Sequence, residues 1–304
     1  MAATVLYPRV ALIGIGLINS SIARAIKRHG LARSIVACAK SEATRRRATE
    51  LDLVERTYAD PAEAVRDADL VVLGTPVGTF AELGRVIGPA LKPGATLTDV
   101  GSVKAAVVRD IGPHIPAGVD FVPAHPVAGT EHSGPDAGFA ELFEERWCIV
   151  TPTASARPEA VERLIGFWRR LGSRVDVMEP AHHDLVLAIT SHLPHLIAYN
   201  IVGTAKDLES VTEGEVIKYA AGGFRDFTRI AASDPIMWRD VFLNNREAVL
   251  EMLGRFNEDL AVLTRAIRSG DGRTLEEFFA RTRAIRRGII DAGQADPEDQ
   301  KKAR

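Results

Sequence analysis

The chain has 304 residues, of which 46% are hydrophobic and 26% charged; this composition suits a soluble protein of two domains and excludes a disordered or fibrous chain. Thirty-eight basic against 40 acidic residues leave a net charge of −2, without the basic excess typical of a nucleic-acid binder. The apolar run at residues 10–18 is interrupted by glycines and is too short to span a membrane. Cys38 and Cys148 have no paired spacing and predict ordinary buried thiols. We therefore expect a cytoplasmic protein that binds neither nucleic acid nor a membrane.

Short apolar runs alternate with helical patterns in the first half of the chain, as in parallel sheets built from βαβ units. The predicted strands are apolar runs bounded by polar or glycine-rich turns, at residues 10–16, 34–39, 69–76, 95–102 and 120–126. Helical patterns follow the first two strands at residues 19–30 and 41–51. Two more apolar runs, residues 147–151 and 173–178, are candidates to complete the sheet.

Helical spacing of apolar residues dominates after residue 178, and little strand signal remains up to residue 293. Asp234 and Pro235 form a favourable start for one of these helices, because proline suits the first helical turn. The sequence thus predicts an α/β domain of the Rossmann type over residues 1–178 and an all-α domain over residues 179–293. The polar residues 294–304 predict a frayed tail.

A glycine-rich turn follows the first predicted strand and opens the first predicted helix, which is the setting of a dinucleotide-binding fingerprint. Gly14 permits the tight turn, and Gly16 lets backbone N–H groups approach a pyrophosphate at the helix N-terminus. Leu17 and Ile18 continue this turn and are expected in the same cofactor site. The third fingerprint position holds Asn19 instead of glycine or alanine, so Asn19 is expected either to push the helix away from the strand or to bind the phosphate itself.

The end of the second predicted strand bears on the choice of cofactor. An NAD site usually places a carboxylate there for the ribose 2′-hydroxyl. This chain instead has a small residue followed by cationic and hydroxyl side chains: Ala39, Lys40, Ser41 and Arg45. Such side chains suit a 2′-phosphate, so we favour NADP over NAD and leave dual use open. Arg46 and Arg47 are expected on a solvated helix face, whereas Thr75 and Pro76, at the end of a later strand, are expected to line the cofactor site.

Four further motifs follow the fingerprint along the chain. They read DVGSVK at residues 99–104, HPVAGTE at residues 125–131, SHLPH at residues 191–195 and GFRDFTRIA at residues 223–231. In this combination and order the chain resembles the prephenate/arogenate (cyclohexadienyl) dehydrogenases of tyrosine biosynthesis, from about residue 10 to residue 288. The resemblance implies oxidative decarboxylation of prephenate, arogenate or both, to 4-hydroxyphenylpyruvate or tyrosine, with hydride transfer to NAD(P)⁺.

The resemblance also implies which residues carry the reaction. His125 is the expected general base for the ring hydroxyl, since a histidine near its reference pKa of about 6.5 accepts a proton at neutral pH; the alternative is a purely structural histidine. Ser102 matches the family serine that binds the same hydroxyl and the nicotinamide region, and it can cap a helix as well. Arg229 matches the arginine that grips the ring carboxylate, a task that suits the planar guanidinium.

Other residues are expected around the substrate. Arg225 and Asp226 match neighbouring active-site residues of the resembling family. The acidic charge of Glu131, Asp184 and Asp226 would favour the ammonium group of arogenate. Trp238 is either a pocket residue or part of the core. Glu131 follows the catalytic loop and is expected to pair with an arginine as a gate.

The histidines after residue 180 raise the question of a metal site. His192 and His195 lie three residues apart, but Pro194 between them disturbs helical spacing and the resembling family needs no metal, so we expect none. His195 is instead expected to touch the side chain of the substrate, and Asp184 to support the same region. The histidines at residues 182–183 are expected at the surface.

Two other classes of function stay open at this point. One is another dehydrogenase with a Rossmann domain and a helical domain, such as a β-hydroxyacid dehydrogenase or an imine reductase. Those enzymes use a lysine on a helix, and no such lysine motif follows residue 178. The other is a non-catalytic NAD(P) sensor, which needs the glycine turn but neither the base nor the cation. His125 and Arg229 count against both.

Large apolar residues are frequent between residues 235 and 267, more than one small helical domain can hide by itself. Helices that are apolar on more than one face usually bury the excess against a partner. The resembling family dimerises through an all-helical C-terminal domain. We therefore expect a C2 homodimer built mainly from residues 179–290, with Arg225 and Asp226 close to the second subunit.

Overall fold

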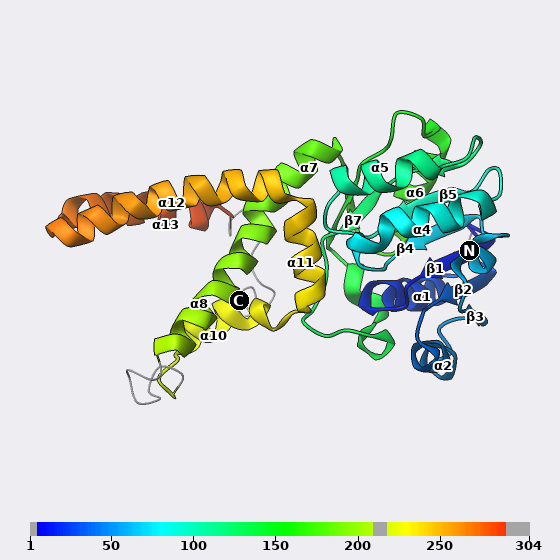
Figure 1. Ribbon diagram of the computed structural model, residues 1–304, viewed down its shortest axis with the longest axis horizontal. Coiled ribbons are helices and arrows are strands. Elements are labelled where there is room, and N and C mark those ends of the chain that lie inside the picture. The colour runs from blue at the N-terminus through cyan, green and yellow to red at the C-terminus, as the bar shows by residue number, and fades with distance from the viewer. Residues whose placement is uncertain (1–4, 209–217, 290–304) are drawn as a thin grey trace. The chain divides into compact units, whose positions relative to one another are not determined.

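The computed structural model describes residues 5–208 and 218–289 (Figure 1), so the polar tail predicted at residues 294–304 lies outside the described residues. The chain divides into two compact units, residues 1–249 and residues 250–304. The unit boundary falls inside helix α12 (Arg246–Ser269). The boundary predicted near residue 178 instead marks the point where strands give way to helices.

A six-stranded parallel sheet forms the centre of the first unit, in the order β3-β2-β1-β4-β5-β6. Its strands are β1 (Arg9–Ile13), β2 (Ser34–Cys38), β3 (Arg56–Tyr58), β4 (Leu70–Leu73), β5 (Thr96–Asp99) and β6 (Asp120–Phe121). This order and the helices that follow confirm the predicted Rossmann-type domain and helical region. β3 escaped the sequence-based prediction because its three residues are only partly buried and carry no apolar run.

Helices cover both faces of this sheet (Figure 1). One face carries α1 (Leu17–His29), α2 (Glu42–Glu50) and α6 (Pro158–Arg170), and the other carries α3 (Pro61–Val65), α4 (Phe80–Ile87) and α5 (Ala105–Ile111). Ile22 and Trp168 lie in the first core, and Phe80 in the second, all fully buried. Because the strands are parallel, their carboxyl ends lie at the same edge of the sheet. Helices cover both faces, so this edge is where a ligand can bind.

The run at residues 120–126 forms two strands rather than one. β6 ends at Phe121, and β7 (Ala124–Pro126) pairs antiparallel with β8 (Trp147–Val150), which pairs in parallel with β9 (Arg174–Val177). The break coincides with Pro123, which has no N–H to donate to a strand ladder. The runs at residues 147–151 and 173–178 therefore do not complete the large sheet; with β7 they form a separate three-stranded sheet.

Helices α7 (Pro180–Leu187) and α8 (Leu193–Leu208) are joined by a π-helical segment, Ala188–His192, into one continuous run. The wide π turn lies just before Pro194, whose ring would otherwise clash with the carbonyl four residues earlier. By length and composition this run could cross a membrane, but one such helix is weak support for a membrane span. In the single chain, 28% of the most apolar 18-residue stretch of this run is buried. The absence of a membrane contact and a cytoplasmic location remain predictions.

Two more helices complete the described part of the first unit, α10 (Gly222–Thr228) and α11 (Pro235–Asn244). α11 begins at Asp234, as predicted, because the Asp234 carboxylate accepts hydrogen bonds from the N–H groups of Ile236 and Met237. The second unit contains the rest of α12 and helix α13 (Gly272–Ile289). These helices expose large apolar side chains, among them Ile267, Phe279 and Ile285.

Candidate active site

A cavity of about 390 Å³ lies at the carboxyl edge of the large sheet, within the first unit. Five parts of the chain line it: the turn between β1 and α1, the segment after β4, the segment after β5, strand β7 with the loop after it, and the start of α11. Eight of the predicted site residues belong to this lining: Gly16, Leu17, Ile18, Thr75, Pro76, Ser102, His125 and Glu131. The chain thus brings the predicted cofactor turn and the predicted base to one space.

The glycine turn has the geometry of a phosphate cradle. Gly14 has φ +83°, and a Cβ there would lie 2.9 Å from the carbonyl of Gly74, so only glycine fits. A Cβ at Gly16 would meet no described atom within 4 Å, which means that Gly16 opens onto the cavity. The opening lies at the start of α1, where the first N–H groups of a helix have no partner within the helix, as in anion sites at helix N-termini.

Asn19 is bonded to backbone carbonyls of the turn and of β4. Its side chain is buried, and Nδ2 donates to the carbonyls of Gly14 at 2.7 Å and of Ile13 and Val72 at 3.3 Å each. Gly74 makes room for the amide, because a Cβ there would lie 2.5 Å from Asn19 Nδ2. Asn19 therefore joins the turn to β4 and lies outside the cavity lining.

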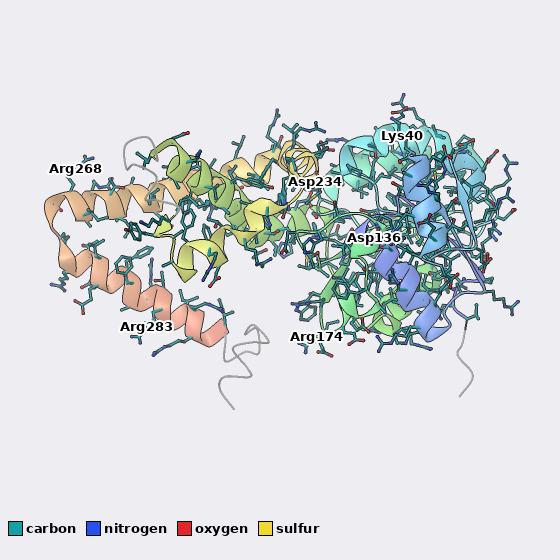
Figure 2. All side chains as sticks on the ribbon, turned by 90° about the horizontal axis from the view of Figure 1, so that it is seen from below. Lys40, Asp136, Arg174, Asp234, Arg268 and Arg283 are labelled. Atoms are coloured by element: carbon teal, nitrogen blue, oxygen red, sulfur yellow. The ribbon has the colours of Figure 1, made fainter. Side chains whose placement is uncertain are left out.

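The predicted 2′-phosphate residues gather at the end of β2. Arg45 Nη1 donates to the carbonyls of Ala39 at 2.7 Å and Lys40 at 2.8 Å, and Ser41 caps α2. Lys40, labelled in Figure 2, is exposed. None of these residues lines the cavity described above. Arg47 is not simply solvated, since Nε donates to Asp136 Oδ1 at 2.9 Å and ties α2 to the loop after β7.

His125 occupies the middle of β7 and is only 7% exposed. Its Nδ1 lies 2.9 Å from Nε2 of His183, whose Nδ1 lies 2.8 Å from Oδ1 of Asp184. Burial, assisted by the nearby His183 and Lys104, lowers the pKa of His125 well below its usual value of 6.5, so the ring is neutral at pH 7. The prediction that His183 lies at the surface is wrong, because its ring is fully buried behind His125; only His182 is exposed.

Asp184 is bonded to backbone groups at the start of α5 and to a side chain just after α11. Its carboxylate accepts hydrogen bonds from the backbone N–H groups of Lys104 at 2.7 Å and Ala105 at 2.9 Å, where α5 begins. Asn245 Nδ2 donates to its backbone carbonyl at 2.8 Å. These bonds hold Asp184 in the interior behind His183, outside the cavity lining.

A buried ion pair positions the segments that carry both predicted catalytic residues. Lys104 and Asp99 are fully buried and paired with each other. Lys104 Nζ also donates to the carbonyl of Ala124 at 2.7 Å, and Asp99 Oδ2 accepts from the N–H of Gly101 at 2.8 Å. Burial raises the pKa of Asp99 and lowers that of Lys104, and their mutual attraction opposes both shifts. Gly101 precedes Ser102 and Ala124 precedes His125, so one pair holds both segments.

His192 and Trp238 form a second buried group. Asn245 Nδ2 lies 3.0 Å from His192 Nδ1, and burial lowers the pKa of His192 to about 4. Trp238 is 6% exposed and packs in the core, as one of its two predicted roles requires. Its ring stacks on His195 at a centroid distance of 3.7 Å, while His195 Nδ1 donates to the carbonyl of Ser191 at 2.8 Å.

Arg229 and Glu131 are paired, as the predicted gate requires. Arg229 Nη1 lies 3.2 Å from Glu131 Oε2, and Glu131 lines the cavity while the Arg229 side chain is 60% exposed. Glu131 therefore connects the cavity to a cation at its rim. Arg225 and Asp226, on α10, are exposed and do not line the cavity in the single chain.

Comparisons with known proteins agree with this geometry. Residues 22–177 match the family described as "Prephenate dehydrogenase, nucleotide-binding domain", and residues 179–281 match "Prephenate dehydrogenase, dimerization domain". The cyclohexadienyl dehydrogenase of Zymomonas mobilis is 42% identical over 280 residues, which are 92% of this chain and 95% of that protein.

Solved structures give the same result. The prephenate dehydrogenase of Aquifex aeolicus, in complex with hydroxyphenyl propionate and NAD⁺, has 33% identity and a TM-score of 0.86, covering 93% of this chain and 98% of that one. The arogenate dehydrogenase of Synechocystis has 26% identity and a TM-score of 0.77, covering 92% and 99%. On these matches and on the fold described above, the chain belongs to the prephenate dehydrogenase family.

Proposed function

We propose that the chain catalyses the NAD(P)⁺-dependent oxidative decarboxylation of prephenate, arogenate or both, a step of tyrosine biosynthesis. The observation that carries this proposal is the shared cavity, in which the phosphate turn at Gly16 and the buried His125 line one space. The Aquifex aeolicus relative was solved with a dinucleotide and a phenol that carries a carboxylate. A cavity with a phosphate turn, a base and a nearby arginine suits that pair of ligands.

The turn fits a dinucleotide because Gly14 and Gly16 leave the space that a pyrophosphate needs. Gly14, Gly16 and the N–H groups of Leu17 and Ile18 would hold the pyrophosphate, and Asn19 would support the turn from below. Thr75 and Pro76 would face the nicotinamide half, next to Ser102. When bound, the cofactor accepts the hydride from the ring carbon that bears the hydroxyl.

His125 is the proposed general base. Its Nδ1 is bonded to His183, so Nε2 is the nitrogen left to take the proton of the ring hydroxyl. Burial keeps the ring neutral, and therefore able to accept a proton, at pH 7. Ser102 lines the same cavity and is proposed to donate a hydrogen bond that orients the hydroxyl and the nicotinamide. Proton removal by His125 allows hydride departure and loss of the ring carboxylate as CO₂, which leaves an aromatic ring.

Arg229 is proposed to bind the ring carboxylate. In the single chain Glu131 already pairs with it, so a substrate carboxylate must replace Glu131 as the partner of the guanidinium. This exchange of partners would act as a gate, because Glu131 would leave Arg229 only when the carboxylate of a substrate takes its place. Arg225 and Asp226 are proposed to complete the rim of the site once a second subunit covers them.

The side chain of the substrate distinguishes prephenate, a keto acid, from arogenate, an amino acid. We propose that His195 contacts this side chain, with Trp238 holding the imidazole plane by stacking. Hydrogen bonding of His195 Nδ1 to a backbone carbonyl leaves Nε2 available to a ligand. Steady-state kinetics with both substrates measure the preference directly.

For the cofactor we propose use of NADP⁺, with NAD⁺ as the second choice. The guanidinium of Arg45 lies at the end of β2, and the exposed Lys40 and the hydroxyl of Ser41 lie beside it. A carboxylate at Ala39, which an NAD site would use, is missing. These features support binding of a 2′-phosphate.

We propose that the protein is a homodimer formed by its helical region. The matched family domain at residues 179–281 is described as a dimerization domain. Helix α8 exposes Ile201 and Val202, and α13 exposes Phe279 and Ile285, which a partner would cover. Light scattering should give about twice 32.9 kDa at micromolar concentration. A fully active monomer at that concentration would contradict the dimer.

The test of the function is a rate measurement with the purified chain. Formation of reduced cofactor should depend on prephenate or arogenate and yield 4-hydroxyphenylpyruvate or tyrosine with one CO₂ per hydride. A β-hydroxy acid serves as the control substrate, because the rival class of dehydrogenase would oxidise it. If cofactor binds but neither cyclohexadienyl substrate is turned over, the sensor alternative replaces this proposal.

A further inference from the structure

We propose that His183 is a positioning residue for the base: it fixes the tautomer of His125 and links that ring to the carboxylate of Asp184. The three side chains form a continuous hydrogen-bonded chain, with 2.9 Å between the two rings and 2.8 Å between His183 and Asp184. The kinetic consequence of this chain rests on the proposed function, whereas the tautomer itself does not.

The direction of each hydrogen bond follows from Asp184. Both oxygens of its carboxylate already accept backbone N–H groups, Oδ1 from Lys104 and Oδ2 from Ala105, so the carboxylate acts as an acceptor toward His183 as well. His183 Nδ1 must therefore carry its proton, and in the neutral ring Nε2 is then the acceptor. His125 Nδ1 must in turn donate to that acceptor. The lone pair on His125 is thereby left on Nε2, for which the described residues provide no hydrogen-bond partner.

The same chain stabilises His125 after it has taken a proton. The imidazolium still donates through Nδ1 to His183, and this bond becomes charge-assisted in a buried site. Within the described residues, hydrogen bonds link Asp184 to His125 through His183. The positive charge of Lys104 lies near both rings and opposes their protonation. The paired carboxylate of Asp99 reduces this effect of Lys104.

The arrangement performs the same task as the buried aspartate of a serine protease triad, with a second imidazole inserted between carboxylate and base. A purely structural role for His183 would be satisfied by its bond to Asp184 alone. The bond to His125 is therefore the part that must be tested. The two rings meet edge to face, with centroids 5.1 Å apart, so their contact is held by this bond and not by stacking.

Two substitutions at one position separate the two bonds. In His183→Asn the amide nitrogen takes the place of Nδ1 and keeps the bond to Asp184, but the side chain is too short to reach His125. In His183→Gln the amide oxygen takes the place of Nε2 and accepts from His125, but the bond to Asp184 is lost. If His183 positions the base, kcat of the Asn variant falls about 10- to 150-fold, and the Gln variant stays about fivefold or more above it. KM and cofactor Kd should stay within about twofold in both.

Two results overturn the proposal: a faster Asn variant would mean that the bond to Asp184 matters more, and equal kcat values would mean that the bond to His125 has no separate effect. A second measurement is independent of the reaction. Proton-detected ¹⁵N spectra of histidine-labelled wild-type protein should show His125 protonated on Nδ1, and the Asn variant should lose this preference. If the wild type turns over neither substrate but shows this tautomer, the proposed function fails and the positioning role stands. A wild-type His125 protonated on Nε2 rejects the positioning role.

Discussion

Asn19 and Gly74 form a matched pair, and changing each alone and both together tests how the cofactor turn is held. In Gly74→Ala the new Cβ would lie 2.5 Å from Asn19 Nδ2 and 2.8 Å from its Cγ. The amide must move by about 1 Å to restore normal contact. That movement breaks its 2.7 Å bond to the carbonyl of Gly14.

The magnitudes follow from these contacts. Overpacking in Gly74→Ala should reduce the free energy of unfolding by about 1–3 kcal/mol. Asn19→Ala leaves buried carbonyls unpaired and should cost a similar amount, about 1–3 kcal/mol. In the double variant the amide is gone, and the methyl group introduced by Gly74→Ala fills part of its space. The double variant should therefore be about as stable as Asn19→Ala alone, with a coupling energy of about 1–3 kcal/mol.

Urea unfolding at fixed protein concentration measures the four free energies, and quenching of protein fluorescence measures cofactor Kd. Gly16→Ala is the control, because its Cβ meets no described atom within 4 Å and projects into the cavity. It should leave unfolding unchanged within about 0.5 kcal/mol and weaken cofactor binding. If the costs of Asn19→Ala and Gly74→Ala add to within about 0.5 kcal/mol, the two residues are not matched and the reasoning is refuted.

Four further predictions concern catalysis, cofactor choice and pH. His125→Asn should lower kcat by about 10²–10⁴-fold with little change in cofactor affinity; near-normal turnover would remove His125 from the mechanism. Arg229→Ala should raise substrate KM by about 10- to 150-fold, and a loss of cofactor affinity instead would assign Arg229 to the dinucleotide. Ala39→Asp should shift the ratio of kcat/KM toward NAD⁺ by about tenfold, whereas a wild type already selective for NAD⁺ contradicts the premise. Burial lowers the pKa of His192 from 6.5 to about 4. The contribution of the neutral His192 to stability is therefore complete above pH 6.5. The free energy of unfolding should fall as the pH drops from 6.5 toward 4, because the unfolded chain binds the proton first. A free energy of unfolding that stays constant from pH 6.5 to about 5 in urea titrations would contradict this sign.

The sequence predicts well what depends on local pattern. Alternating apolar runs identify most strands of the large sheet, and the spacing of Gly14 and Gly16 after a strand identifies the cofactor turn. The division of residues 120–126 between two sheets is decided by Pro123 and by pairing with a strand more than twenty residues later. Such pairing leaves no local signal, and a continuous apolar run looks the same in either case.

The missed residues of the site are polar groups buried by tertiary contacts. Lysine is almost always exposed, so Lys104 in the DVGSVK motif gives no sign that it is fully buried beside Asp99. Of two adjacent histidines, only one can face the core, and His183 rather than His182 does so. The π-helical segment that follows α7 changes the angle between successive side chains around the helix axis. A period of 3.6 residues counted back from the buried His192 therefore does not predict that His183 is buried.

The bond between His125 and α7 has a consequence for building chimeras of related enzymes. A natural place to exchange the nucleotide-binding region is the change from strands to helices near residue 178. A crossover there would pair His125 of one parent with His183 and Asp184 of another, and would also change what caps the first N–H groups of α5. A crossover after Leu187, at the end of α7, keeps these groups together. Modular recombination in this fold should therefore respect the end of α7 rather than the end of the last strand.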